Sequence, residues 1–188
     1  REAPPQHSSW RATDSLEGYL IQHDIVGISG VDTRALTRHI RSKGAMRGAI
    51  APREVNPTPL LERVLAHPRM EGLDLACGVS TDRRYEVSAF GEERFHVLAY
   101  DFGVKAHSPR LLAERGCRVT VIPAETPTAD VLAERPDGLF VSNGPGDPAA
   151  VEKAEGAILS LSEIGTPVFG ICLGHQLIAR AFGAETYK

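Results

Sequence analysis

The chain has 188 residues, of which 42% are hydrophobic and 24% are charged, as in ordinary globular proteins. This length is sufficient for one sizeable domain or two small ones with buried cores. A net charge of -3 and an isoelectric point near 6.2 give no electrostatic reason to expect nucleic acid or an anionic membrane as a partner.

No apolar run approaches the roughly 18 residues that a transmembrane helix needs. The cysteines are odd in number and far apart in the chain: Cys77, Cys117 and Cys172. Because this spacing offers neither a disulfide framework nor a CxxC motif, we expect a cytoplasmic protein with no metal site. The chain begins at Arg1 rather than at a methionine, so we expect it to be part of a longer protein.

The front part of the chain mixes short elements without an evident repeat. Helical spacing of apolar residues, an N-cap at Asp32 and a stop at Gly44 predict helices, and short apolar runs predict strands. In chain order we expect a helix over 15–24, a strand over 25–30, a helix over 33–43, a strand over 44–50 and a helix over 59–67.

From about Phe95 onward strands and helices alternate four times. The expected strands are 95–100, 118–123, 138–142 and 167–171, and the expected helices are 110–116, 129–136, 149–165 and 173–183. This alternation predicts an α/β fold with a mostly parallel sheet flanked by helices, preceded by a smaller mixed α/β N-terminal domain. We place the boundary in a polar stretch near residue 92, which gives domains 1–92 and 93–188.

Cys172 lies where an apolar strand turns sharply into a helix, with Gly170 and Gly174 on either side. This G-x-nucleophile-x-G arrangement is typical of a nucleophile elbow, in which glycines permit the close approach of strand and helix. The helix N-terminus favours thiolate over thiol, and the N–H of Leu173 is free to face an oxyanion. A lone cysteine in an apolar run is more often a small core residue, but the flanking glycines favour the nucleophile.

The segment Asn143–Pro148, NGPGDP, follows the preceding strand and so lies at the same edge of a parallel sheet. Taken alone it is a turn that caps the next helix through Asp147. Its position beside the cysteine makes it a plausible second oxyanion donor and a loop that shapes the substrate site.

Longer motifs add a family resemblance. SNGPGDP followed by GICLGHQ resembles the paired signature of class I, cysteine-dependent glutamine amidotransferases. YDFGVK from Tyr100 is similar to the version in the carbamoyl phosphate synthetase small-subunit family, and Val31–Ile50 resembles the N-terminal domain of that family. The resemblance implies a glutaminase component of a ligase that serves arginine and pyrimidine biosynthesis.

The resemblance also implies roles for individual residues. Cys172 would attack glutamine to form a γ-glutamyl thioester, with the backbone amides of Gly144 and Leu173 as the oxyanion hole. Gly144, Gly146, Leu173 and Gln176 would bind L-glutamine. No cofactor is expected on this chain, since it lacks a phosphate-binding loop, and ATP with Mg is expected on the partner large subunit of carbamoyl phosphate synthetase.

The chain differs from the family in its lack of a recognisable general base. Family members use a histidine oriented by a glutamate two residues later, both well downstream of the nucleophile, and no such pair follows Cys172 before Lys188. His175 belongs to the helix after the elbow, and we expect it to pack or to form hydrogen bonds rather than to act as a base. Two alternatives stay open, namely another class I glutamine amidotransferase and a non-catalytic α/β module that binds a metabolite or a partner.

Overall fold

The computed structural model describes residues 6–51, 56–151 and 153–186. These residues fall into two compact units, one up to Arg69 and one from Met70 onward. The segment 70–92 is grouped with the second unit because Ala76 is fully buried there and Tyr85–Val87 joins its sheet. The division into an N-terminal domain over 1–92 and a second domain over 93–188 stays a prediction. No helix in the described ranges is long and apolar enough to span a bilayer.

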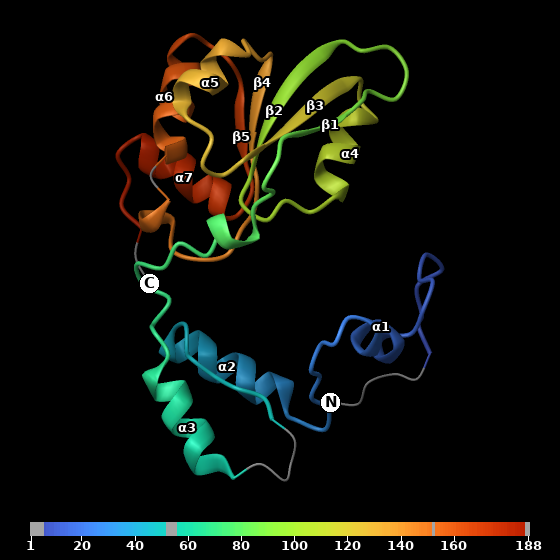
Figure 1. Cartoon of the computed structure of the whole chain (residues 1–188), viewed down its shortest axis with the longest axis vertical. Coiled ribbons are helices and arrows are strands. Elements are labelled where there is room, and N and C mark those ends of the chain that lie inside the picture. The colour runs from blue at the N-terminus through green and yellow to red at the C-terminus, as the bar shows by residue number, and fades with distance from the viewer. Residues whose placement is uncertain (1–5, 52–55, 152, 187–188) are drawn as a thin grey trace. The chain divides into compact units, whose positions relative to one another are not determined.

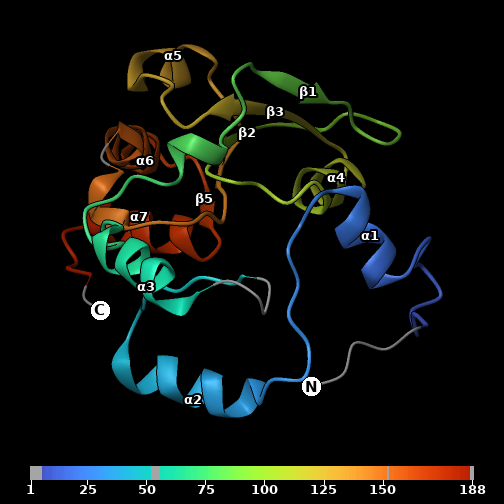
Figure 2. The same cartoon turned by 60° about the horizontal axis from the view of Figure 1, so that its bottom comes forward.

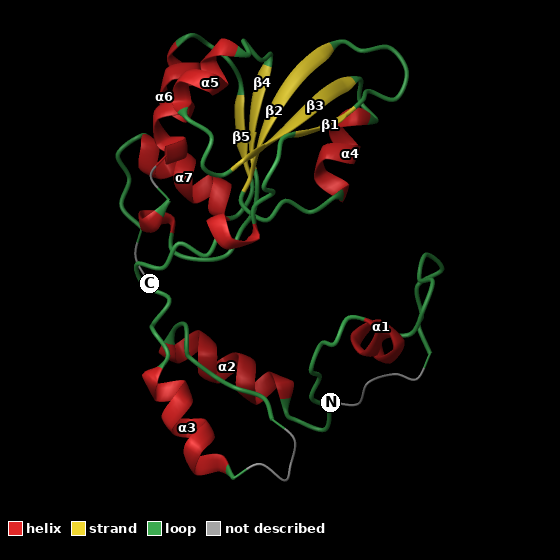
Figure 3. Cartoon of the chain, in the orientation of Figure 1, coloured by secondary structure: helices red, strands yellow, loops and turns green. Residues whose placement is uncertain are grey.

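Three helices make up the regular structure described in the front unit: α1 (Leu16–Gln22), α2 (Thr33–Lys43) and α3 (Pro57–Ala66) (Figure 3). Each begins at a side-chain cap, as the Asp32 carboxylate shows by accepting hydrogen bonds from the N–H groups of Arg34 and Ala35. The strands predicted at 25–30 and 44–50 are wrong, since both segments are loops. An isolated strand with no neighbour to pair with leaves its backbone groups to water, and these segments have no sheet partner within the described residues.

The front unit also lacks a buried core in its described part. No residue within 6–51 or 56–69 is buried, and large apolar side chains such as Trp10, Ile21 and Leu65 are exposed. Its internal contacts include the Arg47 guanidinium, which donates to the carbonyl oxygens of Leu65 and His67, both at 2.6 Å. Helix propensity and caps therefore account for its local structure, and burial contributes little.

The second unit contains a five-stranded sheet in the order β1-β3-β2-β4-β5 (Figure 1). The strands are β1 (Tyr85–Val87), β2 (Phe95–Asp101), β3 (Cys117–Pro123), β4 (Gly138–Val141) and β5 (Val168–Gly170). All neighbouring pairs are parallel except β1 with β3, which confirms the predicted mostly parallel α/β sheet. Sequence reasoning missed the edge strand β1 because its three residues lie within a polar segment.

Helices cover both faces of this sheet. Figure 2 shows α4 (His107–Ala113) on the side opposite to α6 (Lys153–Glu163) and α7 (Leu173–Ala181), and α5 (Thr128–Ala133) packs beside α6. The single helix predicted over 149–165 is wrong at its start: a 3-10 turn, η2 (Pro148–Ala150), comes first and α6 begins at Lys153. The Asp147 carboxylate caps η2 by accepting from the N–H of Ala149. A second 3-10 turn, η1 (Cys77–Val79), precedes β1.

The core consists of two apolar layers, one on each face of the sheet. Because side chains alternate along a strand, Leu98 and Tyr100 of β2 pack towards α6 and α7, whereas Ala99 packs in the layer that includes Leu112 of α4. All three β2 residues are fully buried. The carboxyl ends of the strands are thereby held on a rigid support, and these ends carry the predicted site.

Candidate active site

The predicted site residues follow the carboxyl ends of two adjacent strands, β4 and β5, and β2 ends beside them. β2 pairs with β4, and β4 pairs with β5, so the segments that leave these strands are neighbours at one edge of the sheet. They begin with Phe102 after β2, Ser142 after β4 and Ile171 after β5. The structure therefore brings the NGPGDP loop and the cysteine elbow together, as the sequence predicts.

Cys172 connects β5 to α7 in a strained backbone conformation. Its φ of 53° and ψ of -111° are rare for a residue with a side chain, and such conformations concentrate at functional sites. The residue is the N-cap of α7, and it is exposed. The sharp turn thus presents the sulfur at the surface rather than in the core, which fits the predicted nucleophile better than the alternative of a small core residue.

Two close backbone approaches explain the flanking glycines. A methyl group at position 174 would lie 2.0 Å from the carbonyl oxygen of Val141, and one at position 170 would lie 2.5 Å from the carbonyl carbon of Gly174. The N–H of Gly174 donates to the Ser142 carbonyl at 3.0 Å, and the N–H of Ile171 donates to the Val141 carbonyl at 3.1 Å. The elbow is therefore fixed against the end of β4, and only glycine fits at positions 170 and 174.

Gly144 and Leu173, the residues that carry the two predicted oxyanion donors, lie against each other. A methyl group at Gly144 would be 2.9 Å from Cδ2 of Leu173 and 2.1 Å from the carbonyl oxygen of Phe102. Within the described ranges, neither the N–H of Gly144 nor that of Leu173 has a hydrogen-bond acceptor. Gly146 adopts a positive φ of 101°, which glycine alone accepts without strain. The loop can thus approach the elbow closely and leave two backbone donors available.

Sequence reasoning missed the residues that hold the loop after β2 and that connect it to the NGPGDP segment. The Asp101 carboxylate, 6% exposed, accepts hydrogen bonds from the N–H groups of Gly103 at 2.8 Å, Val104 at 2.7 Å and Thr81 at 2.9 Å. The Asn143 side chain donates to the Gly103 carbonyl at 2.8 Å. A motif match could have drawn attention to Asp101 in YDFGVK, but its partners lie up to twenty positions away and appear only in the fold.

The remaining candidates lie on the first turn of α7. Gln176 is exposed, and its N–H donates to the Cys172 carbonyl at 3.1 Å, which places it one turn after Cys172. His175 is also exposed, and no hydrogen bond among the described residues joins it to Cys172. The exposure of His175 therefore gives no support for the packing role that we expected.

The other two cysteines differ from Cys172 in their environment. Cys117 begins β3 in the core, and burial raises the pKa of its thiol. Cys77 is half-buried, and burial, followed by hydrogen bonds with Asp74 and Glu125, raises the pKa of its thiol to about 12. Both groups are held as protonated thiols at neutral pH, which weakens them as nucleophiles.

Comparisons with known proteins agree with this geometry. The family description "Glutamine amidotransferase class-I" matches residues 98–188, and "Carbamoyl-phosphate synthase small chain, CPSase domain" matches residues 1–50. Carbamoyl phosphate synthase small chains from Synechococcus sp. and Xanthomonas campestris are 49% and 48% identical over 100% of this chain, which covers 51% and 53% of those proteins. The chain from Corynebacterium glutamicum is 46% identical, again over 100% of this chain and 49% of that protein. The chain thus spans about half the length of the curated relatives that it matches.

Proposed function

We propose, on the premise that this chain belongs to the carbamoyl phosphate synthase small-chain family, that the whole protein is the glutaminase component of that enzyme. It hydrolyses L-glutamine through a thioester on Cys172 and supplies ammonia for carbamoyl phosphate synthesis. The observation that carries the proposal is the exposed, strained Cys172 beside two backbone N–H groups that lack acceptors among the described residues.

The chemistry follows from that arrangement. The Cys172 thiolate attacks the side-chain amide carbon of glutamine, and the negative charge that develops on oxygen is stabilised by the N–H groups of Gly144 and Leu173. Collapse of the tetrahedral intermediate breaks the C–N bond and releases ammonia once the nitrogen has taken a proton. Water then hydrolyses the thioester. Gly146 and the exposed side chain of Gln176 hold the substrate beside the sulfur.

The proton transfers require a base. No His-x-Glu sequence follows Cys172 within this chain, so we assign that role to a downstream histidine and glutamate of the whole protein, as the family resemblance implies. A thiolate without a positioned base has little of the catalytic advantage that general acid–base chemistry provides, about 10²–10⁴-fold. Residues 1–188 alone are therefore expected to turn over little glutamine.

The partner large subunit carries out the steps that need ATP. This chain carries no GxxxxGK[ST] phosphate loop, so the ATP-dependent steps, with Mg, belong to the large subunit. Both subunits act in the cytoplasm, where the product serves arginine and pyrimidine biosynthesis. The match of residues 1–50 to the small-chain domain favours this assignment over another class I amidotransferase.

The test of the glutaminase role uses the whole protein assembled with its large subunit. Cys172→Ser should abolish carbamoyl phosphate synthesis from glutamine and retain synthesis from ammonium chloride, because the cysteine only liberates ammonia. Cys117→Ala, in the core and away from the elbow, serves as the matched control and should retain both activities. Retention of glutamine-dependent synthesis in Cys172→Ser would refute the assignment of the nucleophile.

Docking to the large subunit is assigned to the front unit, on α2. Arg34, Arg38 and Arg41 are exposed on this helix, where a partner surface can reach them. Reversal of all three to glutamate should weaken association on the order of tenfold, because charges at the edge of an interface act mainly on the rate of association. The reactivity of Cys172 should be unchanged. Arg63→Glu on α3 is the control. Unchanged association after the triple reversal would remove this face of α2 from the interface.

A further inference from the structure

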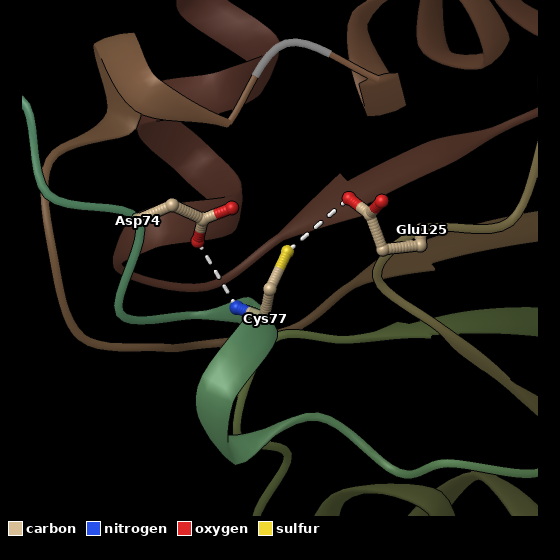
Figure 4. A group of neighbouring side chains, drawn as sticks. All are labelled: Asp74, Cys77 and Glu125. Atoms are coloured by element: carbon tan, nitrogen blue, oxygen red, sulfur yellow. Dashed lines mark hydrogen bonds between the residues drawn. The ribbon is translucent and has the colours of Figure 1, made fainter.

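Three donor side chains outside the candidate active site converge at the same edge of the sheet. Figure 4 shows Asp74, which precedes η1, and Cys77, the first residue of η1, facing Glu125 from the loop that follows β3. Their donor atoms all lie within 4.8 Å of one another. The Cys77 thiol donates to Oε1 of Glu125 at 3.3 Å, and the N–H of Cys77 donates to Oδ1 of Asp74 at 3.0 Å.

The separation of these atoms suits a small divalent cation. Zinc binds cysteine sulfur at about 2.3 Å and carboxylate oxygen at about 2.0 Å, so two such ligands on one tetrahedral ion lie about 3.5 Å apart. The distance between the Cys77 sulfur and the Glu125 oxygen, 3.3 Å, is close to that value. The Asp74 donor oxygen lies within 4.8 Å of the other two donor atoms, and the side chains of Asp74 and Glu125 are exposed.

The donor types select the class of metal. Metal binding displaces the Cys77 proton to solvent, and the resulting thiolate is a soft ligand that zinc and cadmium accept and that magnesium and calcium do not. The two carboxylates supply the remaining negative charge. A cation already lies against the cluster, because the exposed Lys153 ammonium forms an ion pair with the second carboxylate oxygen of Glu125. The cluster therefore attracts positive charge, and Lys153 is free to swing into solvent when a metal replaces it.

We propose that Asp74, Cys77 and Glu125 form a binding site for a zinc-class divalent cation, with the remaining coordination position open to water. The ion would join the segment around η1 to the loop after β3. That segment supports the substrate loop, because the N–H of Asp147 donates to the Leu73 carbonyl at 3.2 Å and the N–H of Gly72 donates to Oδ2 of Asp147 at 2.9 Å. The site is structural: it braces the back of the NGPGDP loop and takes no part in the chemistry at Cys172.

The experiment measures metal binding by the whole protein and needs no activity assay. Cadmium chloride is titrated into metal-free protein while the ultraviolet absorption of the cadmium–thiolate bond is followed, and zinc chloride is titrated in competition with a chelating dye. We expect one ion per protein at this site, at least tenfold weaker binding in Cys77→Ser and in Glu125→Gln, and no competition from magnesium chloride. Lys153→Met should strengthen binding, because it removes the competing ammonium.

Matched variants separate this site from other thiols. Cys117→Ser should retain the cadmium signal, since that residue lies in the core layer on the α4 face of the sheet. Cys172→Ser should also retain it, although it removes the exposed sulfur of the elbow. Absence of binding, a cadmium signal that survives Cys77→Ser, or a signal that disappears with Cys172→Ser would each overturn the proposal.

Discussion

Replacement of Asp101 by alanine should destabilise the protein by about 4 kcal/mol, because three backbone N–H groups lose a buried charged acceptor. A hydrogen bond to a charged group contributes about 1.5–3 kcal/mol, and the carboxylate accepts three. We take a sum near the low end because the loop can relax and admit water. Asp101→Asn should cost about half as much, since its oxygen can still serve Gly103 and Val104 while its NH₂ group faces the N–H of Thr81.

The assay is urea unfolding of the whole protein, with the midpoint and the slope of the transition compared among variants. The control is Asp82→Ala, an exposed carboxylate close in sequence, which should shift stability by less than about 0.5 kcal/mol. An unchanged slope with a lowered midpoint shows that stability has fallen without a change in the surface exposed on unfolding. If the free energy of unfolding of Asp101→Ala lies within about 1 kcal/mol of that of the unmodified protein, the three hydrogen bonds do not hold the loop after β2.

Three further predictions concern the elbow, the cysteines and pH. Gly174→Ala should cost on the order of 3 kcal/mol or prevent folding, because its methyl group would lie 2.0 Å from the Val141 oxygen, whereas Gly78→Ala, with open space around it, should cost far less in the same urea assay. A glutamine-derived diazoketone should label Cys172 in the whole protein, and peptide mapping that finds the label mainly on either other cysteine would contradict the assignment. Burial, with Arg118 nearby, lowers the pKa of His96 from its usual 6.5. Folded protein therefore disfavours the protonated ring, so stability falls as the pH drops through about 6.5, and His96→Gln should reduce that fall in thermal unfolding followed between pH 8 and pH 5.

The sequence predicted those parts of the fold that depend on local apolar runs. β2 to β5 were expected because each reads as a short hydrophobic segment, and their parallel pairing follows from the helices between them. The strands expected at 25–30 and 44–50 failed for the converse reason, since a strand requires a partner that a local pattern does not specify. The same limit applies to Asp101, whose contact with Thr81 crosses twenty positions, and to Cys77, whose partner Glu125 lies 48 positions away.

The proposed nucleophile and the proposed oxyanion donors depend on different parts of the sheet. Cys172 is positioned by the close packing of Gly174 against the end of β4, whereas Gly144 is positioned through Gly103, whose loop Asp101 holds at the end of β2. Damage to the first support should move the sulfur, and damage to the second should move the Gly144 N–H while the sulfur stays in place. Asp101→Asn in the assembled enzyme should therefore retain labelling of Cys172 while glutamine turnover falls, because formation of the tetrahedral intermediate depends on both groups.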